Sequence, residues 1–270
     1  MRSAITLCLV PEAREGPFVF HESLGVSCRT AAELGFDAVE IFPGSAADVA
    51  VDALRRILAA HGLTVAAMGT GAGWLKHRLH LCHPDASVRD RACEFIATII
   101  DVAGDLGAPA IIGSMQGRSG DGVSHDTALV MLADALGRLG ERASQRGQPL
   151  LYEPLNRYET DLFTTQAKAA AFLEQHCLHD VKLLCDLFHM NIEEADPAAA
   201  LAAVGDRVGH VHWADSNRRA MGMGHTDPGP IIAALRSIGY TGFLSAEIFP
   251  LPTPLDAARQ SIESIRTFAP

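Results

Sequence analysis

Short apolar runs recur along the whole chain, each bounded by polar or glycine-rich stretches. Runs of this length with such boundaries are typical of buried strands in a parallel sheet, which are apolar on both faces. We predict eight of them, at residues 4–9, 37–42, 64–69, 109–113, 149–153, 182–186, 208–213 and 242–247.

Longer stretches with helical periodicity separate these runs. We predict helices near residues 25–35, 46–62, 85–107, 125–147, 164–176, 196–204, 228–239 and 254–268. The stretch at 85–107 has the clearest boundaries, because it opens at Pro84-Asp85 and closes at a glycine. Glycines stand at four of the expected helix ends, as C-cap glycines do: Gly35, Gly62, Gly107 and Gly239.

Strict alternation of eight strands with eight helices predicts an α/β protein with one (β/α)₈ TIM barrel. The alternative is an open sheet of six or seven strands with irregular edges. We favour the barrel because the count closes at eight and no second domain is left over. The length of 270 residues suits a single barrel domain over 1–270.

Charge and cysteine usage narrow the classes of partner. The chain carries 22 basic and 32 acidic residues, a formal charge of −10, which repels phosphate backbones and argues against nucleic acid. None of the six cysteines forms a C-x-x-C pair, which indicates a reducing cytoplasm. We find neither a signal peptide nor an apolar stretch long enough to cross a membrane, so we expect a cytoplasmic protein with no membrane partner.

Four of the predicted strands end in residues of metal-ligand type: Glu153, Asp186, His212 and Glu247. Active sites of TIM barrels lie at the carboxyl ends of the strands, and these four strands are consecutive neighbours. Burying such side chains is costly unless they are paired or bind a metal, and no Lys or Arg is adjacent in sequence. The pattern therefore predicts a divalent-metal centre.

The donor set also indicates which metal to expect. Three carboxylates and one imidazole favour Mn²⁺, Mg²⁺ or Co²⁺ over a structural zinc. An octahedral ion with four protein ligands keeps positions open for substrate oxygens, for example those of an α-hydroxyketone. We expect no nucleotide cofactor, because residues 69–73 (GTGAG) do not match G-x-G-x-x-G and no Walker A motif is present.

Strand periodicity separates His210 from His212. If His212 points into the barrel, so does His210, but about 6–7 Å deeper. We therefore interpret His210 as a hydrogen-bonded core histidine rather than a fifth ligand. Glu40, at the end of the second strand, is unexplained by metal chemistry and can reach the pocket from the far side.

Four blocks of sequence resemble the xylose-isomerase-like sugar epimerases. They are 153–160 (EPLNRYET), 186–191 (DLFHMN), 210–218 (HVHWADSNR) and Glu247. Within that superfamily they resemble most the ketose 3-epimerases, including the D-tagatose 3-epimerase and 5-keto-L-gluconate epimerase types. The resemblance covers nearly the whole chain.

The resemblance implies a role for each of seven residues. Glu153, Asp186, His212 and Glu247 would bind the metal, Glu153 and Glu247 would also be the catalytic acid/base pair, and Glu159, His189 and Arg218 would bind the substrate. Mn²⁺ is the expected ion, with Co²⁺ and Mg²⁺ as alternatives. The expected partner is a small-molecule sugar, and the expected assembly is a homodimer or a homotetramer.

The implied reaction has a physical rationale. A metal chelated by the C2 carbonyl and the C3 hydroxyl stabilises the enediolate formed when C3 loses its proton. Inversion needs a base on one face of C3 and an acid on the other, so two carboxylates must flank it. Glu153 and Glu247, from strands five and eight, suit those positions.

Other readings of the same pattern remain open. A hydroxypyruvate isomerase-like aldose–ketose isomerase would use the same metal site, with Arg118 binding a carboxylate or phosphate. A binding protein or dehydratase relative would not need both glutamates. An endonuclease IV-like repair enzyme needs histidines after strands three and four, where this chain has 68–70 (MGT) and 113–115 (GSM).

Several polar residues also have plain structural readings. His189 can cap a loop, and Glu159 can be an ordinary loop carboxylate. Arg218 and Arg219 are adjacent, and only the spacing from His212 favours Arg218 as the substrate contact. The histidines at 77, 80 and 83 fit an exposed polar loop.

Overall fold

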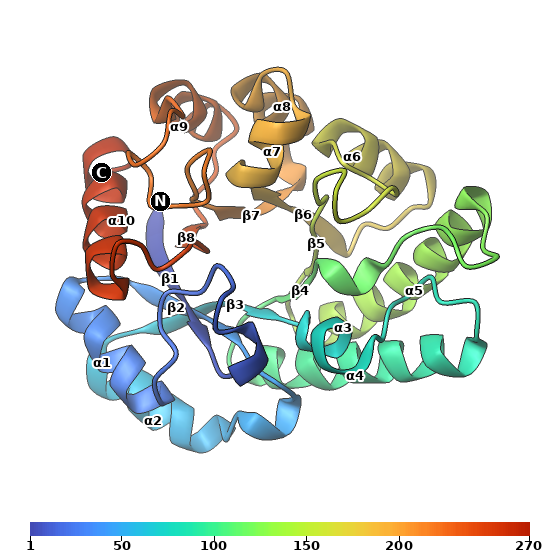
Figure 1. The fold of residues 1–270 in the computed structure, drawn as a ribbon, viewed down its shortest axis with the longest axis horizontal. Coiled ribbons are helices and arrows are strands. Elements are labelled where there is room, and N and C mark those ends of the chain that lie inside the picture. The colour runs from blue at the N-terminus through green and yellow to red at the C-terminus, as the bar shows by residue number, and fades with distance from the viewer.

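The computed structural model describes residues 1–270, and its eight strands form a closed parallel barrel in sequence order (Figure 1). The strands are β1 (Arg2–Cys8), β2 (Ala38–Phe42), β3 (Thr64–Gly69), β4 (Ala110–Ile112), β5 (Leu150–Tyr152), β6 (Val181–Asp186), β7 (Val208–His212) and β8 (Phe243–Ala246). β8 pairs with β1 in the register Arg2↔Phe243, which closes the ring. The predicted TIM barrel is confirmed, and every strand boundary lies within two residues of the prediction.

Helices surround the barrel in the predicted alternation. They are α1 (Leu24–Leu34), α2 (Val51–His61), α3 (Ala72–His77), α4 (Ala86–Asp105), α5 (His125–Gln145), α6 (Gln166–Gln175), α7 (Leu187–Glu193), α8 (Pro197–Val204), α9 (Pro228–Ser237) and α10 (Pro254–Phe268). Short 3₁₀ helices occur at Pro11–Ala13, Ala46–Asp48, Ser114–Gln116 and Gly205–Arg207. None of the helices is long and apolar enough to cross a membrane.

The structure corrects the prediction in three places, all near the carboxyl ends of strands. The helix predicted from residue 46 begins at Val51, because 46–48 form a separate 3₁₀ turn. The short helices α3 and α7 were not predicted. Each follows a strand almost directly and spans only six or seven residues, too few for helical periodicity to be recognised.

Helix ends follow from local chemistry. The Asp85 carboxylate accepts a hydrogen bond from Ser87 N at the start of α4, and Asp227 accepts one from Gly229 N at the start of α9. Gly35 ends α1 with φ of 85°, a left-handed conformation that costs glycine little.

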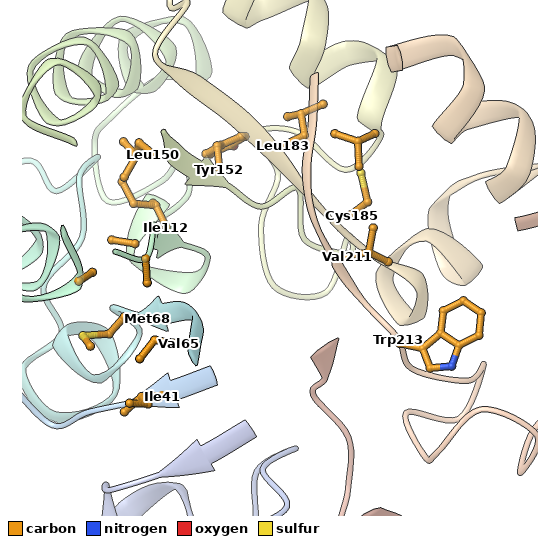
Figure 2. Packing of buried hydrophobic residues seen from close by; sticks show 14 of the residues in the cluster. Ile41, Val65, Met68, Ile112, Leu150, Tyr152, Leu183, Cys185, Val211 and Trp213 are labelled. Atoms are coloured by element: carbon orange, nitrogen blue, oxygen red, sulfur yellow. The ribbon is translucent and has the colours of Figure 1, made fainter. Parts of the chain in front are cut away.

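The main core lies between the barrel and its helices, where alternate strand residues point outward (Figure 2). Ile41, Tyr152 and Val211 belong to this layer and are fully buried. A smaller cluster lies inside the barrel, and each member is next in sequence to an outward-facing residue of β3 to β6: Ala67, Ile111, Leu151 and Leu184. This alternation directs the polar residues of β2 and β7 into the barrel. All six cysteines are free.

Candidate active site

A cavity of about 400 Å³ lies at the carboxyl ends of the strands and is lined by residues from all around the rim. Glu153 follows β5 directly, Asp186 ends β6, His212 ends β7 and Glu247 follows β8. The barrel thus brings the four predicted ligands to neighbouring positions. Glu153, Asp186 and His212 are buried, and the Glu247 side chain is 14% exposed.

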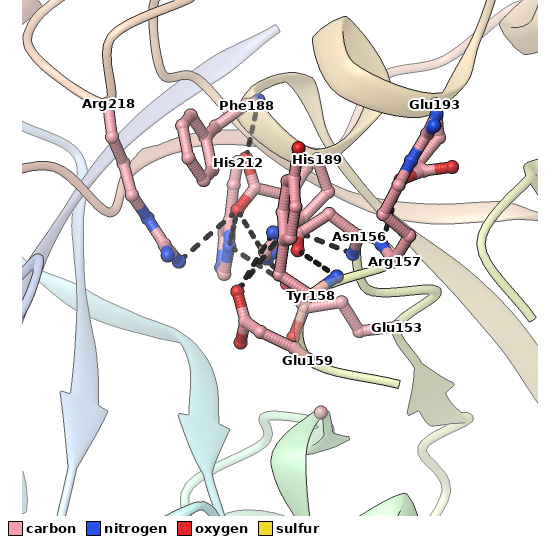
Figure 3. A network of polar contacts seen from close by, with 12 residues as sticks. Glu153, Asn156, Arg157, Tyr158, Glu159, Phe188, His189, Glu193, His212 and Arg218 are labelled. Carbon is pink, nitrogen blue, oxygen red and sulfur yellow. Dashed lines mark hydrogen bonds and ion pairs between the residues drawn. The ribbon is translucent and has the colours of Figure 1, made fainter. Parts of the chain in front are cut away.

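The His212 imidazole is the centre of this group. Its Nδ1 atom lies 3.8 Å from Glu153 Oε1, 3.7 Å from Asp186 Oδ2 and 3.6 Å from Glu247 Oε2. This nitrogen therefore faces three carboxylates from three other strand ends. Figure 3 shows His212, His189 and Glu153 converging, with Arg218 reaching toward them from the opposite side.

Two buried atoms of this group lack hydrogen-bond partners, and this shows whether a metal would fit. Asp186 Oδ2 and His212 Nδ1 are buried and have no hydrogen-bond partner. Leaving such atoms unsatisfied costs about 1–3 kcal/mol each. A divalent cation between them would satisfy both, and Glu153, Asp186 and His212 offer ligand atoms that all lie within 4.8 Å of one another. The residues present fit a metal of the hard, oxygen-preferring kind.

Burial and mutual charge set the protonation of the group. Burial raises the pKa of Glu153 well above its usual value and also raises that of Glu247. Asp186 is buried as well, but His189, His212 and Arg218 lower its pKa below the usual range. Burial opposes charge on His212, yet the carboxylates of Glu40 and Glu247 raise its pKa well above the usual value.

Arg218 supplies the positive charge that the local sequence lacks. Its Nη2 donates to Glu247 Oε2 at 2.6 Å and lies 3.6 Å from Asp186 Oδ2. The guanidinium carbon lies 4.9 Å from the centre of the Phe188 ring. The carboxylates thus have an arginine partner, although it is distant in sequence. Arg218 lines the cavity, and its neighbour Arg219 is exposed and does not.

A buried aspartate holds the loop that presents Arg218. Asp215 Oδ2 accepts from the backbone N–H groups of Gly222 and Gly224, and Oδ1 accepts from those of Ser216 and Thr226. Arg218 sits in this loop with a φ of 57°, a conformation that non-glycine residues seldom adopt. Sequence reasoning missed Asp215. The glycines that follow it were the available signal.

His189 lies in α7, buried beside the group rather than capping a loop. Its Nδ1 accepts from the backbone N–H of Asn156 at 3.3 Å and lies 2.7 Å from Asn156 Nδ2. The proton of a neutral imidazole is then on Nε2, which lies 3.6 Å from Asp186 Oδ2 and 3.7 Å from Glu153 Oε1. His189 therefore presents a donor to the cavity.

Asn156, which the sequence analysis did not single out, connects His189 to Glu159. Its Nδ2 also donates to Glu159 Oε1 at 2.9 Å. The Glu159 side chain is 42% exposed and lines the cavity, so this carboxylate is held at the rim by one hydrogen bond.

His210 is a hydrogen-bonded core histidine, as predicted. Its Nε2 lies 2.7 Å from Glu40 Oε2, and Glu40 reaches the cavity from β2. Two residues that the sequence analysis named for other roles, Arg118 and His77, lie outside the cavity lining. Arg118 is exposed, and His77 ends α3 at the surface.

The remaining histidines of that loop are only partly exposed, unlike the loop we predicted. His80 is half-buried with Nδ1 unpartnered, and burial beside His83 lowers its pKa to about 4. Trp74 packs edge-on against His80 and lines the cavity.

The half of the cavity formed by β1–β4 is mostly apolar. Phe18, Phe42, Trp74 and Leu75 line it. The rings of Phe18 and Phe42 lie 4.5 Å apart and are tilted by 33°. Gly69 leaves room for the Phe42 ring, because a Cβ atom there would lie 2.8 Å from it.

Curated relatives match most of the chain. An L-ribulose 3-epimerase of Mesorhizobium japonicum is 33% identical over 80% of this chain and 72% of its own length. A ketose 3-epimerase of Arthrobacter globiformis is 30% identical, covering 84% and 78%. The 3-dehydro-D-guloside 4-epimerase of Escherichia coli is 30% identical over 92% of this chain and 96% of its own length.

Solved structures agree with the fold. A structure of L-ribulose 3-epimerase superposes with a TM-score of 0.81 at 27% identity, covering 98% of this chain and 93% of the other. The sequence matches a family described as xylose isomerase-like TIM barrel over residues 28–268. This protein therefore belongs to the xylose isomerase-like TIM barrel family.

Proposed function

We propose that this isomerase is a divalent-metal-dependent sugar epimerase that inverts a carbon next to a ketone, with Glu153 and Glu247 as acid and base. The observation that carries the proposal is the convergence of three carboxylates on His212 Nδ1, two of them with raised pKa values. Relatives that match most of the chain are named as sugar epimerases.

The two glutamates suit proton transfer on opposite faces of one carbon. They follow strands β5 and β8, so they approach the cavity from different sides. A carboxyl whose pKa is raised toward neutrality is effective both in taking and in giving a proton. One glutamate would remove the proton, and the other would return it on the opposite face.

Glu153, Asp186, His212 and Glu247 would hold the metal. When bound, a divalent ion would supply the positive charge that stabilises the oxygens of an enediolate. We expect Mn²⁺, with Co²⁺ and Mg²⁺ as alternatives, because the donor set is mostly oxygen.

Two further residues would orient the substrate. His189 presents Nε2–H beside Glu153, and Arg218 presents a guanidinium beside Glu247. Both can donate hydrogen bonds to carbonyl or hydroxyl oxygens next to the reacting carbon. Glu159, exposed at the rim, can accept from a more distant hydroxyl.

The charge of the cavity favours a neutral ketose over a keto-sugar acid. Glu12, Glu40, Glu153, Glu159 and Glu247 all line the cavity, whereas Arg218 is the single Lys or Arg among the lining residues and already pairs with Glu247. Apart from a bound metal ion, an anionic substrate would find no lysine or arginine free to pair with it, and it would lie near carboxylates such as those of Glu12 and Glu159. The same balance weakens the hydroxypyruvate isomerase alternative, since Arg118 lies outside the cavity.

A second candidate is 4-epimerisation of a 3-keto-glycoside. The Escherichia coli 4-epimerase matches over 96% of its length, against 72% and 78% for the two 3-epimerases compared above. Inversion of C4 next to a C3 ketone needs the same two carboxylates. The aromatic half of the cavity offers apolar faces on which a sugar ring can stack.

Deuterium exchange tests both candidates. The Mn²⁺-loaded protein would be incubated in D₂O with neutral ketoses, 3-keto-glycosides and keto-acids, and NMR would locate the label. Label at C3 of a ketose, or at C4 of a keto-glycoside, together with both epimers, is the expected result and decides between the candidates. Label at C1 or C2 with an aldose product would identify an isomerase instead. Absence of exchange on every substrate would contradict the proposal.

A further inference from the structure

We infer that Glu40 is the positioning residue that fixes the orientation and tautomer of His212 as a metal-binding imidazole. This inference rests on the metal site of the proposed function. Glu40 comes from β2, whereas His212 ends β7, so the contact spans the barrel interior. The Glu40 side chain is only 6% exposed, and its environment is therefore set by protein groups rather than by solvent.

Both oxygens of Glu40 are engaged by imidazoles. Oε1 lies 3.0 Å from His212 Nε2, and Oε2 lies 2.7 Å from His210 Nε2. An ionised carboxylate only accepts hydrogen bonds, so each histidine donates through Nε2–H. A neutral His212 then has its lone pair on Nδ1, the atom that faces Glu153, Asp186 and Glu247.

This geometry matches a recurring arrangement in metalloproteins. A histidine that binds a metal through one nitrogen commonly donates the other N–H to a carboxylate, which fixes the ring and strengthens the ligand. The unpartnered Nδ1 of His212 is the other half of that arrangement. Glu40 thus acts on the metal through His212.

His210 would hold Glu40 in turn. It lies two residues before His212 on the same strand, and the two rings are nearly perpendicular at 84°. With Oε2 bound to His210, the carboxylate keeps Oε1 directed at His212. A glutamine at position 210 keeps an amide N–H that can donate to Oε2, so His210→Gln preserves this restraint on Glu40 and is the matched control for Glu40→Gln.

The three residues admit one competing reading, in which they bind an ion themselves. Glu40, His210 and His212 offer ligand atoms within 4.8 Å of one another. The Glu40 contacts of 2.7 and 3.0 Å are, however, hydrogen-bond lengths, and they leave His212 Nδ1 free for the other cluster. We therefore assign the group to support of His212.

The test is the metal affinity of Glu40→Gln. An amide can accept through one oxygen only, so its NH₂ group must face one of the two Nε2–H donors and disturbs the pair. Calorimetric titration of metal-free protein with Mn²⁺ is expected to give an affinity about 10–100-fold lower than wild type. The absorption spectrum of the Co²⁺-loaded variant is expected to change as well. His210→Gln should retain an affinity close to wild type.

Thermal unfolding of the metal-free variants separates positioning from misfolding. The inference is supported if Glu40→Gln unfolds at the same temperature as the His210→Gln control but binds Mn²⁺ more weakly. An unchanged Mn²⁺ affinity of Glu40→Gln would overturn the inference. A wild-type chain that binds two Mn²⁺ ions, one of which is lost in both variants, would overturn it as well, because Glu40, His210 and His212 would then bind an ion themselves. If wild type binds Mn²⁺ but catalyses no deuterium exchange on any substrate, the proposed function is contradicted and the inference about Glu40 is not. Wild type that binds no Mn²⁺ would defeat both.

Discussion

The two halves of the barrel rim differ in chemistry. The β5–β8 half supplies Glu153, Asp186, His212 and Glu247, together with His189 and Arg218, and every one of these has a polar or charged neighbour from the same half. The β1–β4 half supplies the apolar side chains of Phe18, Phe42, Trp74 and Leu75. The difference suggests that one half performs the chemistry and the other fits the part of the substrate that does not react.

Glu40 is the main exception to this division. It is a carboxylate from β2, yet its hydrogen bonds go to two histidines of β7. Burial opposes its ionisation, but His212 and His210 together lower the pKa of Glu40 below its usual range. The polar network of the β5–β8 half therefore extends across the barrel interior to β2.

Removing one glutamate should give the largest effect. Glu247→Gln keeps the shape of the side chain but cannot carry a proton, so exchange in D₂O should fall by about 10²–10⁴-fold. Deuterium incorporation by NMR measures the loss, with Mn²⁺ affinity measured in parallel. Glu159→Gln, at the exposed rim, is the matched control and should lose far less. Equal losses in both variants would remove the distinction between Glu247 and the other cavity carboxylates.

Crowding Glu153 from the neighbouring strand should have the next largest effect. A Cβ atom at Gly113, which follows β4, would overlap Glu153 Oε2. Gly113→Ala adds no charge and removes no donor, yet it must displace that carboxylate. A misplacement of about 1 Å can cost about 10²-fold in rate.

Steady-state rates of Gly113→Ala and of a control glycine variant would check this. Gly137 lies in α5 and has its nearest neighbour, Leu178 Cδ2, at 3.5 Å, an ordinary contact. Gly137→Ala should therefore leave the rate unchanged. If Gly113→Ala also retains full activity, the rate does not depend on the present position of the Glu153 carboxylate.

The strands and the meeting of the candidate ligand residues at one rim were predictable, because each depends on a short local pattern. A buried strand is apolar throughout, and the residue that ends it reaches the rim by barrel geometry alone, as for Asp186 and His212. Strand parity was enough to separate His210 from His212.

The missed features depend on contacts between distant segments. Arg218 pairs with Glu247 across 29 residues, and Glu40 bonds to His212 across 172 residues. No local sequence pattern predicts either of these two contacts. The helix α7 was missed because its seven residues contain less than two helical turns beyond its cap.

Stability should depend on pH through the loop that carries Arg218. Burial opposes ionisation of Asp215, but the backbone N–H groups of Thr226, Gly224, Ser216 and Gly222 lower its pKa from 3.8 to about 2. A carboxyl with a lowered pKa in the folded protein stabilises it fully above the unfolded value. This contribution, about 2–3 kcal/mol, is lost as the pH falls from about 4 through 2.

Asp215→Asn tests that linkage. An amide NH₂ would face two of the backbone donors, so the variant should unfold more easily at pH 7 by about 2 kcal/mol. Urea denaturation at pH 7 and pH 3 measures the difference, which should shrink at the lower pH. A constant difference between the two pH values would mean that Asp215 is not the titrating group.

The apolar half should respond most weakly and most selectively. Phe42→Leu removes an aromatic face but keeps an apolar side chain, so it should leave Mn²⁺ affinity and the site of deuteration unchanged. The KM for a keto-glycoside should rise by about tenfold, which corresponds to roughly 1.4 kcal/mol of lost stacking. The KM for a short ketose that does not reach Phe42 should change little. Equal changes in KM for both substrates, or a loss of metal affinity, would show that the β1–β4 half is not limited to contacting the part of the substrate that does not react.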